Sequence, residues 1–227
     1  MIPGPTYVYA CPDCQFRVSK RSIMSGNTFG AIQFSDLRIE APMKPRYPYI
    51  TKCKRCACTF WLDDSTKVEG TIADRFISFY DDQFARNDDK NPVFGDQLEI
   101  HPALELDQES IKDALFMNVQ RNEEDEKYLR YLLLWEYHKQ LLDGTITRET
   151  LNKELDYLEN IDILLRLIEG DENSLFFCAE LHRFAGRFDR CLEILEPYVE
   201  EFMGPILGEI HERCLSGNRD VFEINLS

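Results

Sequence analysis

Hydrophobic residues alternate with polar ones in the first part of the chain and recur at three- and four-residue steps further on. From 31 to 40 the apolar positions form two alternating pairs on either side of Ser35-Asp36, which predicts a hairpin or a bulged strand. Further short extended segments are predicted at 16–18, 49–51 and 59–62. The N-terminal part of the chain is therefore predicted to consist of short strands.

The helical period begins near Thr71. Residues 87–102 contain an Asn-Pro pair, a glycine and several acids, which is typical of an exposed acidic linker. Beyond it, capping residues, glycine stops and a Gly-Pro start divide the chain into further helices. These helices are predicted over 107–118, 123–142, 147–170, 172–185, 189–198 and 205–216, followed by a short extended tail at 221–224. Pro197 is expected to kink or end the helix that contains it.

These patterns predict an α+β protein with three parts. Residues 1–65 form a small module of short antiparallel strands, residues 66–104 a connecting helix with an acidic linker, and residues 105–227 an all-helical, repeat-like domain. A chain of 227 residues is long enough for one small and one medium domain.

The charge is distributed unevenly between these parts. The net charge is −15, but residues 1–60 carry nine Lys and Arg against three acids, whereas residues 61–227 carry 17 bases against 38 acids. A basic module is thus joined to an acidic one. No stretch approaches the roughly 18 apolar residues of a membrane span, and the N-terminus lacks the pattern of a signal peptide. We therefore expect a soluble, cytoplasmic protein that does not contact a membrane.

Two cysteine pairs carry the most specific chemistry in the chain. Cys11 and Cys14 are separated by two residues, and so are Cys53 and Cys56, with 38 residues between the pairs. Two residues between cysteines let both sulfurs of a tight turn point at one ion, and two such turns supply the four-thiolate shell of a structural zinc site. A module with so small a core depends on its metal to fold. We therefore predict a zinc ribbon with one zinc per chain.

Two alternatives to this metal site stay open. Iron in a rubredoxin-like site uses the same four-thiolate cage. Cys58 is a second choice for the place of Cys56, although the two-residue spacing favours Cys56. Because four thiolates leave no position for water, a catalytic zinc is not expected.

A segment near the C-terminus resembles a tetratricopeptide repeat. Ala179 stands at the small position of the first helix, Gly186 in the turn, Phe188 at the aromatic position after it and Cys191 at the second small position. The resemblance implies a helix pair that needs a neighbouring helix, 126–142 or 205–216, over its remaining apolar side. The residues expected inside this pair are Leu175, Cys178, Ala179 and Cys191. As a whole, a ribbon with the segment 25–30 followed by Tyr128-Leu129-Arg130 and this repeat resembles bacterial proteins of unassigned activity.

Signals for catalysis are weak throughout the sequence. No phosphate-binding loop, dinucleotide fingerprint or nucleophile elbow occurs. Glu209, His211, Glu212 and Cys214 lie on one predicted helix, but Glu209 and His211 do not share a face, so His211 is predicted to be a surface histidine and not part of a second metal site or a nucleophile pair. His182 is predicted to pack within the repeat, and the sequence indicates no partner for His101 or His138.

The function predicted from these features is that of a non-catalytic scaffold or adaptor, in which the helical domain binds a protein partner and the zinc orders the N-terminal module. An acidic helical surface would attract a basic partner. Its predicted residues are Glu180, Asp189, Glu193, Glu196, Glu200 and Glu201. The alternatives are a nucleic-acid-binding accessory factor that uses the basic ribbon, and an iron redox carrier.

Overall fold

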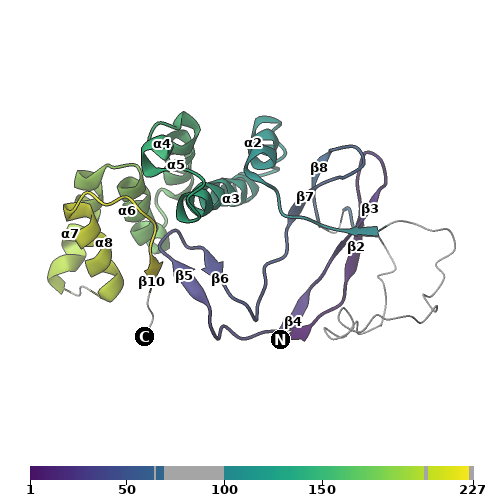
Figure 1. Cartoon of the computed structure of the whole chain (residues 1–227), viewed down its shortest axis with the longest axis horizontal. Coiled ribbons are helices and arrows are strands. Elements are labelled where there is room, and N and C mark those ends of the chain that lie inside the picture. The colour runs from purple at the N-terminus through teal and green to yellow at the C-terminus, as the bar shows by residue number, and fades with distance from the viewer. Residues whose placement is uncertain (64, 69–99, 202–203, 225–227) are drawn as a thin grey trace. The chain divides into compact units, whose positions relative to one another are not determined.

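The computed structural model describes residues 1–63, 65–68, 100–201 and 204–224 (Figure 1). It confirms an α+β protein in which short strands precede a series of helices. The predicted helix from Thr71 and most of the predicted linker lie outside the described residues. The chain forms two compact units. We call residues 1–31 and 41–110 the strand unit, and residues 32–40 and 111–227 the helical unit.

Short paired strands make up the strand unit. They are β1 (Ile2–Pro3), β2 (Tyr7–Ala10), β3 (Arg17–Lys20), β4 (Ile23–Ser25), β7 (Ile50–Lys52), β8 (Thr59–Trp61) and β9 (Ile100–Pro102). The pairs β2–β3, β7–β8 and β1–β4 are antiparallel. Strand β9 pairs in parallel with β3, so Arg17 faces Ile100. The end of the predicted linker, residues 100–102, is therefore a strand in a sheet and not an exposed connection.

The helical unit contains most of the described helices. They are α3 (Glu123–Leu142), α4 (Arg148–Leu151), α5 (Leu155–Ile168), the 3₁₀ turn η1 (Glu172–Ser174), α6 (Leu175–Phe184), α7 (Phe188–Glu201) and α8 (Pro205–Leu215). Helix α2 (Gln108–Phe116) runs across the boundary between the two units. Among the described residues, no helix is both long enough and apolar enough to cross a membrane.

Local capping explains why several of these helices begin where the sequence predicts. The carboxylate of Asp107 accepts a hydrogen bond from the Ser110 N–H at 2.8 Å, and Asn122 accepts one from the Asp125 N–H at 2.9 Å. Gly204 precedes Pro205 at the start of α8. A side-chain acceptor supplies a partner for an N–H group that the first turn of a helix leaves unsatisfied.

Three of the predicted helices differ from those in the structure. The single helix predicted over 147–170 is two helices, α4 and α5, because Glu154 adopts an extended backbone between them. The helix predicted over 172–185 begins as the 3₁₀ turn η1. Helix α7 continues past Pro197 to Glu201 and starts at Phe188, one residue before the predicted cap.

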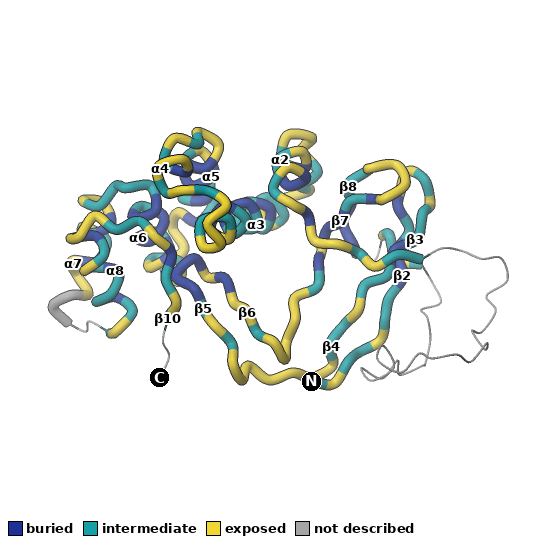
Figure 2. The backbone as a smooth tube through the Cα atoms, viewed as in Figure 1, coloured by how far each residue is buried: buried dark blue, intermediate teal, exposed yellow. Residues whose placement is uncertain are grey.

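The hairpin between the two cysteine pairs belongs to the helical unit. Strands β5 (Ile32–Phe34) and β6 (Ile39–Glu40) pair on either side of the predicted turn, and the tail strand β10 (Glu223–Ile224) adds to β5. The Ser35 N–H donates to the Phe222 carbonyl at 2.9 Å. The end of β5 and the first two residues of the turn after it, Ser35 and Asp36, are buried (Figure 2). The chain therefore leaves the strand unit after its first cysteine pair and returns before its second.

A buried polar cluster anchors this hairpin among the helices. Asp36, His138 and Tyr157 are fully buried. The His138 Nδ1 lies 2.8 Å from the Asp36 carboxylate, and its Nε2 lies 3.1 Å from the Tyr157 hydroxyl. The Trp135 indole N–H donates to the Asp36 carbonyl at 2.8 Å. His138, for which the sequence indicates no partner, is thus the central residue of the cluster.

Candidate metal centre

The first cysteine pair occupies the turn between β2 and β3. The Cys11 N–H donates to the Phe16 carbonyl at 2.9 Å, and the Gln15 N–H donates to the Cys11 carbonyl at 2.9 Å. Gln15 has a φ of 61°, a left-handed conformation that few residues adopt. This residue reverses the chain directly after Cys14, and both thiols of the pair remain on the inside of the turn.

The second pair repeats this backbone between β7 and β8. The Cys53 N–H donates to the Cys58 carbonyl at 2.8 Å, the Ala57 N–H donates to the Cys53 carbonyl at 2.9 Å, and Ala57 has a φ of 61°. Cys58 therefore occupies the position that Phe16 has in the first turn. The Cys58 thiol lies 3.7 Å from the Thr59 carbonyl oxygen. Cys58 is not a member of the cluster that Cys11, Cys14, Cys53 and Cys56 form. The structure thus favours Cys56 over Cys58 as the fourth ligand.

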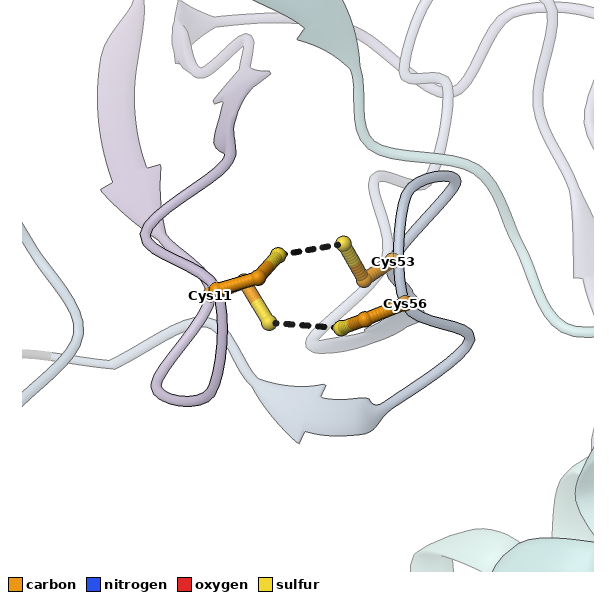
Figure 3. A group of neighbouring side chains, drawn as sticks. Cys11, Cys53 and Cys56 are labelled. Atoms are coloured by element: carbon orange, nitrogen blue, oxygen red, sulfur yellow. Dashed lines mark hydrogen bonds between the residues drawn. The ribbon is translucent and has the colours of Figure 1, made fainter.

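The four thiols of Cys11, Cys14, Cys53 and Cys56 converge between the two hairpins (Figure 3). Their sulfur atoms all lie within 4.8 Å of one another, with 3.5 Å between Cys11 and Cys56 and 3.6 Å between Cys14 and Cys53. Bonds of about 2.3 Å to a tetrahedral ion place sulfurs about 3.8 Å apart. The cluster therefore has the donor set and the dimensions of a four-thiolate metal site.

The thiols of Cys11, Cys53 and Cys56 differ widely in pKa. Burial raises the pKa of Cys11 to about 11. Burial also acts to raise the pKa of Cys53, but the N–H groups of Cys56 and Arg55 outweigh it and lower this pKa to about 7. At Cys56 the Cys58 N–H favours the thiolate, but desolvation and the neighbouring sulfurs raise the pKa to about 12. A bound dication reverses this repulsion, so metal binding releases protons.

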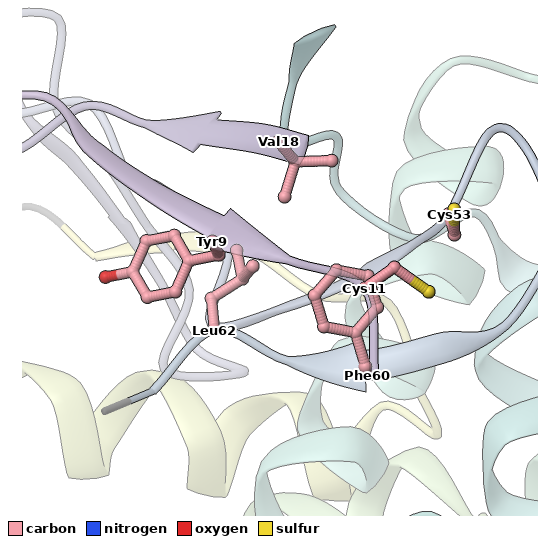
Figure 4. Close-up of a cluster of buried hydrophobic side chains, with 6 residues drawn as sticks. All are labelled: Tyr9, Cys11, Val18, Cys53, Phe60 and Leu62. Atoms are coloured by element: carbon pink, nitrogen blue, oxygen red, sulfur yellow. The ribbon is translucent and has the colours of Figure 1, made fainter. Parts of the chain in front are cut away.

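The hydrophobic core around the cluster is small. Six buried residues form its centre, two of them the cysteines Cys11 and Cys53, and partly buried side chains such as Tyr7 and Phe16 pack against them (Figure 4). The other buried residues are Tyr9, Val18, Phe60 and Leu62. Cys14 is half-buried and Cys56 is exposed, so the cluster lies at the edge of this core. Since so few apolar side chains hold the two hairpins together, a shared metal ion would supply much of their cohesion.

The remaining described cysteines and histidines are not members of this cluster. Among the residues that the structure describes, these four cysteines are the only group of three or more possible metal-ligating side chains that converge. Cys214, which falls in a helical stretch where the sequence favours small buried side chains, is buried against Cys191. The His101 ring stacks on Phe16 at a centroid distance of 5.4 Å.

Not all of the basic residues counted for the N-terminal module are exposed in the strand unit. Arg38 is buried in the helical unit, where its guanidinium pairs with Glu40. Lys52 donates to the Ser110 hydroxyl at 3.3 Å. Lys54 and Arg55 are exposed at the tip of the second cysteine turn. The basic charge available around the cluster is therefore smaller than the sequence count suggests.

Comparisons with known proteins identify no relative. No protein-family model matches the chain, and no curated protein or solved structure matches it either. The likenesses to zinc ribbons and to tetratricopeptide repeats therefore stay predictions.

Proposed function

We propose that this chain is a non-catalytic, zinc-binding scaffold or adaptor, with an N-terminal zinc ribbon and a tetratricopeptide-like helical part. One observation supports this proposal above all others: four cysteine thiols from two matching hairpins converge on one point. Four sulfurs complete a tetrahedral shell and leave no position for water or a substrate. A metal held in this way orders the chain and does not activate a reactant.

Zinc suits these residues better than the harder metal ions. Cysteine thiolates are soft ligands that select zinc, copper(I) or iron–sulfur chemistry over magnesium or calcium. The N–H groups that lower the pKa of Cys53 prepare a thiolate in the second turn before any metal binds. Iron in the same cage is the alternative, and it would make the strand unit a redox carrier.

The packing of α6, α7 and α8 supports a tetratricopeptide-like arrangement. Ala179 on α6 and Cys191 on α7 have no exposed surface, and Gly186 between them has a φ of 76°. Helix α8 covers the pair through Leu207, Ile210 and Cys214. Leu175 and Cys178, expected inside, are only half-buried. A lone helix pair of this kind needs such a cover, because repeats bury their apolar faces against neighbours.

The proposed partner site is the acidic exposed face of α7. Asp189, Glu193 and Glu196 are exposed on this helix. Glu180, expected on the same surface, is 2% exposed and pairs with Arg183 inside the unit. The side chains of Glu200 and Glu201 lie outside the described ones. A surface with this charge would attract a basic protein and raise its rate of association.

The metal part of the proposal is tested by comparing two neighbouring cysteines. We expect the purified chain to contain one zinc, the Cys53→Ser variant to lose it and the Cys58→Ser variant to keep it, as measured by elemental analysis of protein prepared without nickel. Iron with a red colour would support the redox alternative. Metal-free folded protein would contradict both.

The adaptor part is tested with charge reversal in the full chain. Glu193→Lys combined with Glu196→Lys should abolish capture of a basic partner from cell extract at low salt, because it reverses the proposed surface. A matched control variant combines Glu149→Lys with Asp156→Lys, which reverses the charge of two side chains that are 81% and 59% exposed. Equal loss in both double variants would show a non-specific charge effect, and turnover of a small molecule would overturn the scaffold proposal.

A further inference from the structure

Two cysteines face each other where α7 packs against α8. The sulfur atoms of Cys191 and Cys214 lie 2.7 Å apart and share a hydrogen bond. Both side chains are buried, at 0% and 3% exposure. They belong to the apolar cluster that joins Ala179 on α6 to Leu195 on α7 and Ile210 on α8. Their neighbours hold the two thiols in contact.

This pair is not a second metal centre. Within the described parts of the chain, only the cluster in the strand unit gathers three or more possible ligands. Two sulfurs without a third ligand do not make a closed metal site. Two thiols in contact are, however, the arrangement from which a disulfide forms.

We propose that Cys191 and Cys214 are a reversible thiol–disulfide site, which a peroxide oxidises to a covalent link between α7 and α8. This inference is independent of the proposed adaptor function. It gives the helical unit two states that differ by one bond in its C-terminal helix pair.

The oxidation proceeds in two balanced steps. The Cys214 thiolate attacks one peroxide oxygen, the O–O bond breaks, and the departing hydroxide takes up the thiol proton as water, which leaves a sulfenic acid on Cys214. The Cys191 thiol then attacks the Cys214 sulfur, the S–S bond forms, the S–O bond breaks and a second water leaves. Two thiols lose two electrons in total, and hydrogen peroxide is reduced to two waters.

The surroundings of the pair support Cys214 as the first nucleophile. The hydrogen bond between the two thiols lowers the pKa of Cys214 although burial acts in the opposite direction, and the Arg183 charge adds to the lowering. Glu180 opposes it. The same hydrogen bond raises the pKa of Cys191, so this residue keeps its proton until the second step. The thiolate is the nucleophilic form of cysteine.

The disulfide should stabilise the helical unit by linking two helices across 22 intervening residues. A link across a loop of that length should raise the thermal midpoint of the unit by about 10–15 °C. Because both sulfurs are buried, we expect the reaction to need an oxidant as small as a peroxide.

The test is peptide mapping of the full, metal-loaded chain before and after treatment with hydrogen peroxide. Trypsin cleaves after Arg190, Arg213 and Arg219, so Cys191 and Cys214 fall in separate peptides, 191–213 and 214–219. We expect these two peptides to be linked after oxidation and separate again after dithiothreitol. The thermal midpoint, followed by far-UV circular dichroism, should rise and then fall with the link.

Matched variants separate this pair from the other thiols. Cys191→Ser and Cys214→Ser should each abolish the rise in thermal midpoint, whereas Cys178→Ser, at a half-buried position on α6, should retain it. If the rise persists in either of the first two variants, the proposal is wrong. Mapping of the unsubstituted chain decides the question even if a variant fails to fold: absence of the 191–213 to 214–219 link after oxidation overturns it.

Discussion

Replacing Asp36 with alanine should destabilise the helical unit far more than replacing an exposed aspartate. The Asp36 carboxylate accepts hydrogen bonds from His138 at 2.8 Å and from the Arg38 N–H at 3.1 Å, and its side chain has no exposed surface. Asp36→Ala leaves both donors buried without a partner. It also removes the carboxylate near the Arg38 guanidinium, whose side chain is 5% exposed.

The expected cost follows from these contacts. Each buried donor left unsatisfied costs about 1–3 kcal/mol, and removing one member of a buried charged pair typically costs about 3–5 kcal/mol. We therefore expect Asp36→Ala to lower the free energy of unfolding by about 3–5 kcal/mol, a large part of the 5–15 kcal/mol typical of a domain. Asp36→Asn should cost less, because the amide oxygen can still accept from Arg38 and the amide nitrogen can donate to the other tautomer of His138.

Urea unfolding followed by far-UV circular dichroism measures this cost, since helices α3 to α8 all belong to the helical unit. The control is Asp156→Ala, which removes a surface ion pair with Lys112 from a side chain that is 59% exposed. Such a pair contributes less than about 1 kcal/mol. If Asp36→Ala costs no more than Asp156→Ala, the polar cluster does not anchor the hairpin and this reasoning fails.

Three further predictions concern the helices of the same unit. Ala179→Trp should overfill the contact between α6 and α7 and cost about 1–3 kcal/mol or more, measured by urea unfolding. Pro197→Ala should raise the thermal midpoint, because proline inside a helix costs about 3 kcal/mol relative to alanine. Burial raises the pKa of Glu180 from 4.5 to about 7. Its contribution to stability is therefore fully present below pH 4.5 and is lost as the pH rises to about 7, by up to about 3 kcal/mol. The free energy of unfolding of Glu180→Gln, measured across this pH range, should not show that loss. If the variant and the original chain have the same pH profile of stability, the prediction is contradicted.

The cysteine cluster could be predicted because its chemistry is local. Two residues between cysteines form a turn whose backbone aims both thiols inward, and this holds in both hairpins. Helix starts at Asp107 and Asn122 depend on hydrogen bonds to N–H groups three residues away. Where a feature is set by a contact between residues a few positions apart, the sequence pattern is sufficient to predict that feature.

Contacts between distant residues set the features that the sequence did not predict. Asp36 and His138 are 102 residues apart in sequence, and each alone resembles an ordinary polar surface residue. The break between α4 and α5 has no glycine or proline to mark it. Leu151 before the break and Tyr157 after it are both fully buried. The position of the break is therefore set by how the two helices pack. Such partners are known only once the fold brings them together.

Because the chain passes through both units, the metal and the hairpin are expected to stabilise different units. A metal bound by Cys14 and Cys53 closes a loop of 38 residues, and nine of these form the hairpin segment of the helical unit. Halving the length of a loop lowers the free-energy cost of closing it by only about 0.6 kcal/mol. The ordered hairpin therefore makes metal binding more favourable by less than this amount. Its stability comes instead from Asp36, His138 and the tail strand. Removing the metal with a chelator should therefore open amide exchange in β2 and β3 while Phe34 and Ser35 stay protected. Loss of protection at all four sites would show that the two units fold as one.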